Sequence, residues 1–153
     1  NTNEEAGSDN NSDNNETSDN QTNTDNSTSK VCPKYDRDDY KHWIDEDGDC
    51  QDTRVEVLIA ENQGTISFST SSSCKVVSGS WFDPFTNTTF TEASSLDVDH
   101  MVPLKEAHES VAFEWSSEKK QEYANDLSSE NTLIAVSSSA NRSKGSRVLV
   151  RRY

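Results

Sequence analysis

The stretch DVDHMVP, residues 97–103, decides the fold of this chain. It continues an alternating run, residues 96–100, which predicts a short β-strand, and Pro103 predicts that the strand has ended. Successive side chains on a strand point to opposite faces. Asp99 and His100 can therefore work together only if the strand bends or ends beside them, and Pro103 favours such an end.

The residues after this strand predict helix, helix, strand and helix. Ser116 or Ser117 can cap the second helix. The apolar run TLIAV is too short for a helix and fits a buried strand. A serine at 137–139 can cap the last helix, and Gly145 stops it. The predicted bounds are 104–110, 117–127, 132–136 and 140–144.

The residues before this strand predict a helix and a hairpin. TRVEVLIAE, residues 53–61, fits a helix with Val55, Leu58 and Ile59 on one face, although its β-branched residues leave a strand open. A turn at Asp83-Pro84 joins short strands into a hairpin. The other predictions are a helical turn or two within 35–43, a polar loop over 62–73, and strands over 75–77, 79–82 and 88–91. The sequence therefore predicts an α+β domain.

Residues 1–30 differ in composition from the rest. They contain no aromatic residue and one apolar side chain, Ala6, so they cannot bury enough surface to offset the entropy of ordering them. We expect a disordered polar leader or linker over 1–30 and one folded domain over 31–153.

The net charge is −14, of which the seven acids and Lys30 of the leader contribute −6 and the domain −8. This acidity argues against a protein that coats nucleic acid, because such binding rests on Lys and Arg neutralising phosphates. An acidic protein with one basic end can still hold a polyanion there. The basic residues after Ala140, where no acid follows, are Arg142, Lys144, Arg147, Arg151 and Arg152.

Export is the expected fate of the chain. No stretch approaches the roughly 20 apolar residues of a membrane span. The chain begins without Met or a signal peptide, as a processed form does, and a polar leader is typical of exported proteins, where it can tether a domain to the cell surface. The cysteines match no zinc spacing. In an exported protein Cys50–Cys74 is the expected disulfide, which leaves Cys32 without a partner in this chain.

Asp99-His100, Asn131 and Asn141 are suited to the hydrolysis of a phosphodiester. The reaction needs a base for the attacking water and positive charge at the phosphate and the leaving oxygen. A histidine suits the first task because its pKa lies near neutrality, and activity then falls below roughly pH 6. Mg²⁺ suits the second, and Asp99 and Asn141 offer one carboxylate and one amide oxygen.

The segments DVDHMVP, NTLIAV and SSANRSKG together resemble the signature of HNH (ββα-metal) nucleases, including the HNH domain of RNA-guided CRISPR nucleases. The flanking segments YDRDDYKHWIDEDGDCQDTRVEVLIAE and CKVVSGSWFDPFTNTTFTEASSLDVDHMVPLKEAHESVAFEW resemble the secreted bacterial HNH nucleases of the DUF1524 group. The likeness covers residues 35–145, nearly the whole domain. After SKG the family continues with an acidic stretch containing Pro and Trp, whereas this chain reads SRVLVRRY.

The resemblance implies a ββα-metal core and a role for each matched residue. His100 would be the general base, and Asp99 and Asn141 would hold one Mg²⁺ or Mn²⁺. Asn131 would pin the loop between the strands and orient the histidine.

The function that the resemblance implies is that of an extracellular, monomeric endonuclease. Its substrate would be DNA, with RNA left open, and Lys144 and Arg142 would meet phosphate. No segment is left over for reading bases, so we expect low sequence specificity.

The segment DEDGD, residues 45–49, supports an alternative. Its aspartates match alternate positions of a calcium loop, and a glutamate falls at the twelfth position. Gly48 stands fourth, whereas an EF-hand needs its glycine sixth, where Cys50 stands, so a hydrogen-bonded acidic turn also explains the segment. The alternative function is an exported calcium- or surface-binding module with an inactive nuclease site. The Ca²⁺ ligands would be Asp45, Asp47, Asp49 and Glu56.

Two expectations concern side chains outside these motifs. His108 lies between acids on a predicted helix and is expected at the surface. The aromatic residues expected in the core are Trp81, Phe82, Phe85 and Trp115.

Overall fold

A computed structural model describes residues 30–145. The predicted leader, residues 1–29, and the basic residues Arg147, Arg151 and Arg152 lie outside this part of the chain. None of the helices described is long and apolar enough to cross a membrane.

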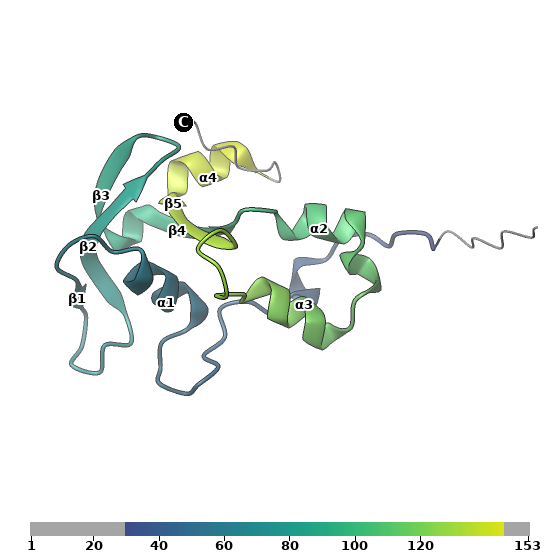
Figure 1. The fold of residues 1–153 in the computed structure, drawn as a ribbon, viewed down its shortest axis with the longest axis horizontal. Helices are drawn as coiled ribbons and strands as arrows, with labels where there is room; N and C mark the ends of the chain where they lie inside the picture. The colour runs from purple at the N-terminus through teal and green to yellow at the C-terminus, as the bar shows by residue number, and fades with distance from the viewer. Residues whose placement is uncertain (1–29, 146–153) are drawn as a thin grey trace, which may run out of the picture. The chain divides into compact units, whose positions relative to one another are not determined.

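Helices and strands are mixed along the chain, so the domain is α+β, as predicted (Figure 1). The helices are α1 (Thr53–Ala60), α2 (Leu104–Ser110), α3 (Ser117–Ala124) and α4 (Ser138–Lys144), with single 3-10 turns η1 (Arg37–Asp39), η2 (Ala93–Ser95) and η3 (Ala112–Glu114). The strands are β1 (Ser67–Phe68), β2 (Val76–Asp83), β3 (Thr88–Glu92), β4 (Leu96–His100) and β5 (Leu133–Ser137).

The strands form two antiparallel sheets. One sheet has the order β1-β2-β3, and the other pairs β4 with β5 from Leu96↔Ser137 to His100↔Leu133. Leu96, Val98 and His100 are buried, whereas the aspartates between them are half-buried, as the alternation in the sequence predicts. The helix α4 follows β5 directly and packs across the β4-β5 pair (Figure 1).

The region predicted as two short strands is the single strand β2, and the loop before it contains β1. The register of β2 against β3 shifts between Ser78 and Trp81, so Gly79 marks a bulge rather than a break. A Cβ at Gly79 would lie 2.5 Å from Cη2 of Trp81. The glycine therefore lets the indole of Trp81 pack into the core, while Phe82 on the other face is exposed, contrary to its predicted burial.

Within the described residues the buried apolar side chains form a main core, a smaller core, and a third cluster of Ile134 and Val136 with Phe85 and Met101 packed against them. The main core joins α1, β2, β4 and β5 through Val55, Leu58, Trp81, Leu96 and Val98, among others. The smaller core gathers Tyr40, Leu104, Ala107, Ala112 and Ala124 at α2 and α3.

The expected surface position of His108 is wrong, because this side chain is fully buried beside the smaller core. Its Nε2 donates to the carbonyl of Pro33 at 2.9 Å, and its Nδ1 accepts from the hydroxyl of Tyr40 at 3.1 Å. The two partners lie on either side of η1, far from His108 in sequence. The neighbouring acids on the helix therefore gave a misleading signal.

A buried carboxylate, Asp83, connects the two sheets. Asp83 stands at the end of β2 and accepts hydrogen bonds from the backbone N–H groups of Phe85 (2.8 Å) and Ser137 (3.0 Å) and from the hydroxyl of Thr86 (2.9 Å). Burial opposes its ionisation, but these hydrogen bonds outweigh burial and lower the pKa of Asp83 below its ordinary value of 3.8.

The lowered pKa of Asp83 predicts how stability depends on pH. The folded state favours the ionised carboxylate, so its contribution is complete above the ordinary pKa of 3.8 and is lost as the pH falls through the lower folded value. Asp83→Asn should lower the free energy of unfolding by about 2 kcal/mol at neutral pH, because it removes charge-assisted hydrogen bonds from buried donors. The free energy of unfolding of this variant should also fall less steeply than that of the wild type as the pH is lowered into the acid range.

Urea unfolding followed by tryptophan fluorescence between pH 7 and pH 2.5 measures both effects. The matched control is Asp38→Asn, since Asp38 is exposed. If the free energies of unfolding of the wild type and Asp83→Asn changed in parallel with pH, the proposed contribution of the ionised Asp83 would be contradicted.

Candidate active site

The face of β4 that carries Asp97 and Asp99 lies against α4. Ser138 donates its hydroxyl to Asp97 Oδ1 at 2.9 Å, and Asn141 donates its Nδ2 to Asp97 Oδ2 at 3.0 Å. One turn further along α4, the ammonium of Lys144 forms an ion pair with Asp99. Asn141 and Lys144 are three residues apart and share one side of the helix, so α4 is fastened to β4 at two points.

The sequence did not single out Asp97, yet this residue positions Asn141. A carboxylate only accepts hydrogen bonds, so the amide nitrogen of Asn141 must face Asp97, which leaves the amide oxygen as the available ligand atom. The sequence did carry a signal for this role: Asp97 is two residues before Asp99, and residues two apart on a strand lie on the same face.

Lys144 lies within the expected site but not on its surface. Its side chain is 6% exposed, that of Asp99 is 18% exposed, and Nζ also donates to the carbonyl of His100 at 3.3 Å. A positive group thus already stands among a carboxylate and a carbonyl oxygen, which are the ligand types that Mg²⁺ prefers. The oxygen set of Asp99 and Asn141 therefore fits a hard divalent cation.

Arg142 is exposed on α4, unlike Asn141 and Lys144, which are both partly buried. Its guanidinium is accessible to solvent beside the site. The expected phosphate contact of Arg142 remains a prediction, as does that of Lys144.

His100 projects from the opposite face of β4, where its ring is 5% exposed. The ring lies between the rings of Trp43 (centroids 6.1 Å apart) and Tyr123 (6.2 Å apart), each inclined by 19° to it. Its Nε2 meets the carbonyl of Ala124 at 2.9 Å. Because a carbonyl only accepts, Nε2 carries the hydrogen, and Nδ1 of the neutral ring keeps a lone pair.

The environment of His100 favours the neutral ring. Burial lowers the pKa of His100 below its ordinary value of 6.5, although the hydrogen bond to Ala124 and the charge of Asp99 act in the opposite direction. Within residues 30–145 no hydrogen bond occupies Nδ1 of His100. Near neutral pH this nitrogen is therefore unprotonated and keeps its lone pair.

The strand β4 remains regular up to His100 and ends there. The bend that Pro103 was expected to favour therefore follows His100 and does not separate it from Asp99. The two side chains lie on opposite faces, and a substrate can reach both only where the strand ends.

The role of Asn131 that the resemblance implied remains a prediction. Its side chain is exposed, and its hydrogen bond within residues 30–145 runs from its backbone N–H to Ser129 Oγ. Thr132 pins the loop, donating its hydroxyl to the carbonyls of Asp126 and Ser129.

Asn125 holds the carbonyl that orients His100, a role the sequence did not reveal. The side chain of Asn125 accepts from the N–H of Ile44 and the hydroxyl of Thr53, and donates to the carbonyls of Lys41 and Gln121. These bonds end α3 at Ala124, three residues before the predicted end. An asparagine at a helix end was the only local signal.

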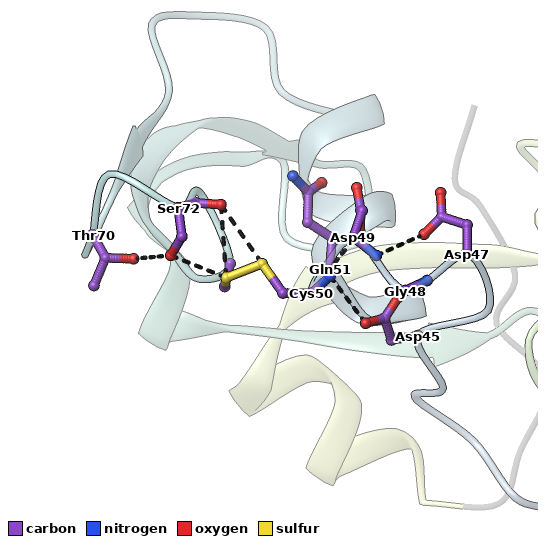
Figure 2. Close-up of a disulfide and its surroundings, with 9 residues drawn as sticks. Asp45, Asp47, Gly48, Asp49, Cys50, Gln51, Thr70 and Ser72 are labelled. Carbon is purple, nitrogen blue, oxygen red and sulfur yellow. Dashed lines mark hydrogen bonds between the residues drawn. A yellow bond between two sulfur atoms is a disulfide. The ribbon is translucent and has the colours of Figure 1, made fainter.

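The acidic loop brings three of the four predicted calcium ligands together. Carboxylate oxygens of Asp45, Asp47 and Asp49 lie within 4.8 Å of one another at the surface (Figure 2). Glu56 on α1 faces them, and its pKa is raised by burial and then by the charges of these aspartates. Cys50, at the sixth position, has φ 74°, the left-handed conformation that a glycine usually supplies.

The predicted disulfide between Cys50 and Cys74 is present and anchors the acidic loop to the turn before β2 (Figure 2). Cys32 is an exposed free thiol.

A secreted protein of the fungus Arthroderma benhamiae, described as uncharacterized, is 44% identical to this chain over 111 residues. The match covers 72% of this chain and 52% of the relative, so the chain spans about half the length of the protein it matches. No family model and no solved structure matches the chain.

The hydrogen bonds of the three histidines predict their tautomers. His100 and His108 donate from Nε2 to carbonyls, whereas His42 donates from Nδ1 to the carbonyl of Tyr40 at 2.8 Å. Nitrogen-15 NMR of the neutral rings should therefore find the hydrogen on Nε2 in His100 and His108 and on Nδ1 in His42. A hydrogen on Nδ1 of His100 would remove its capacity to act as a base at that atom.

Proposed function

We propose that this chain is a metal-dependent endonuclease of the HNH (ββα-metal) type, related to the DUF1524 group. One observation carries the proposal. The helix that follows a two-stranded antiparallel sheet contacts Asp97 through Asn141 and Asp99 through Lys144, on the strand whose last residue is the neutral, oriented His100.

The proposed reaction takes place where β4 ends. Asp99 and Asn141 would hold one Mg²⁺ or Mn²⁺, which supplies the charge that stabilises the scissile phosphate and the leaving 3′ oxygen. His100 takes a proton from the attacking water at Nδ1, while the Ala124 carbonyl holds Nε2 in place. The rings of Trp43 and Tyr123 keep the imidazole desolvated and fixed in orientation.

Lys144 has two positions in this proposal. In the structure its ammonium neutralises Asp99. In the loaded site it would release that carboxylate and turn to the substrate phosphate, together with Arg142. A lysine is suited to such an exchange because its ammonium is a compact charge on a flexible stem.

The proposed substrate is nucleic acid, DNA first and RNA second, cut with low sequence specificity. The polar contacts available at the site fit phosphate, and phosphate contacts position a backbone without reading bases. The description of the relative as secreted and the disulfide Cys50–Cys74 support an extracellular location. Tethering through the leader and a monomeric state belong to the same proposal.

The central test is cleavage of plasmid DNA and of RNA with Mg²⁺ or Mn²⁺. EDTA should abolish cleavage, and His100→Ala should slow it by about 10²- to 10⁴-fold, the usual contribution of a general base. Because burial lowers the pKa of His100, activity should decline only at pH values below 6.5. Cleavage that survives both EDTA and His100→Ala would exclude this mechanism.

The variant Asn131→Ala tests whether the side chain of Asn131 has the role that the resemblance implies. An exposed side chain should be dispensable, so this variant should cleave at the wild-type rate. A loss of activity with unchanged thermal stability would support the role that the resemblance implies.

A second candidate is an exported calcium- or surface-binding module with an inactive nuclease site. The convergence of Asp45, Asp47 and Asp49, whose charges also act on Glu56, favours it. It predicts that Ca²⁺ raises the Tm of the wild-type protein and leaves that of the double variant Asp45→Asn, Asp49→Asn unchanged. Equal melting curves with and without Ca²⁺ would remove this candidate, and nuclease activity would show that the site is not inactive.

A further inference from the structure

The segment from Arg37 to Trp43 packs against the ring of His100. The indole of Trp43 stacks on the imidazole, although Trp43 has φ 59°, a left-handed conformation that is costly for a bulky residue. The ring of His42 meets the edge of Trp43, with centroids 5.3 Å apart and an interplanar angle of 79°. His42 and Trp43 are thus placed relative to His100 by ring contacts.

Arg37 joins this stack through His42. Its Nη2 lies 3.3 Å from Nε2 of His42. Because Nδ1 of His42 donates to the Tyr40 carbonyl, Nε2 carries the lone pair and accepts from Arg37. The ring that accepts from the guanidinium is therefore neutral, and the side chain of Arg37 also interacts with that of Tyr35.

Arg37 is exposed and lies close enough to His100 for its charge to act on the ring. No salt bridge joins it to a carboxylate of residues 30–145. Its charge contributes to lowering the pKa of His100. An exposed cation therefore stands near the candidate base in a domain of net charge −8.

We propose that Arg37, held by His42, binds a backbone phosphate of the nucleic-acid substrate on the His100 side of the site. This assignment rests on the proposed function. The hydrogen bond to His42 uses one nitrogen of the guanidinium. The spacing of N–H groups on the planar guanidinium matches the spacing of phosphate oxygens. The substrate backbone is then held from two directions, by Arg37 beside His100 and by the basic residues of α4 beside Asp99.

The test measures binding without cleavage. Fluorescence anisotropy of a labelled duplex DNA in EDTA, over a series of salt concentrations, gives the dissociation constant and its salt slope for each protein. Arg37→Gln should weaken binding and reduce the slope by about 0.9, the loss of one phosphate contact. Arg37→Lys keeps the charge and should retain the slope. The matched control is Lys75→Gln, which removes an exposed charge from the loop between β1 and β2 and should bind as the wild type does.

The outcomes separate this inference from the proposed function. If the wild type cleaves DNA and Arg37→Gln binds with the wild-type slope, the role of Arg37 is excluded and the nuclease stands. An equal loss in Lys75→Gln would mean that only total charge matters, which also overturns the assignment. If the wild type neither binds nor cleaves nucleic acid, both proposals fail together.

Discussion

The carboxylate of Asp83 sets the position of the helix on which the candidate site depends. No strand pairing joins the two sheets within residues 30–145, so their relation rests on side chains. Asp83 at the end of β2 receives the N–H of Ser137, and the hydroxyl of Ser137 caps α4 through Ala140. One buried acid thus fixes where α4 begins, and thereby where Asn141 and Lys144 meet β4. Hydrogen bonds to an ionised group suit this task, because they are stronger and more directional than neutral ones.

The acids of this domain act in different ways according to their partners. Asp97 is satisfied by a hydroxyl and an amide, and Asp99 by an ammonium, so both are fixed and partly buried. The aspartates of the acidic loop lie at the surface and accept hydrogen bonds from backbone N–H groups of the same loop. The carboxylates of the site accept instead from side chains of α4, so they join two elements, whereas those of the loop stabilise a single turn.

The sequence predicted what depends on local pattern. Residues 96–100 alternate, and β4 has those bounds; the serines and the glycine around α4 cap it as expected. The sequence did not predict which residues far apart in the chain contact one another. Nothing near His108 indicates that Tyr40 and Pro33 bury it, and nothing near Asn125 indicates that it bonds to Lys41, Ile44 and Thr53. Asn141 was found as a site residue, but its partner Asp97 was not, because helical and strand patterns do not show which residues meet.

Trp43 joins the surroundings of the candidate base to the main core. A glycine at this position would adopt the left-handed backbone without strain. It would also remove an indole that packs against the main core and stacks on the ring of His100. The packing of the indole therefore holds the strained backbone in place. A substitution that relieved the strain would loosen the core and the imidazole together.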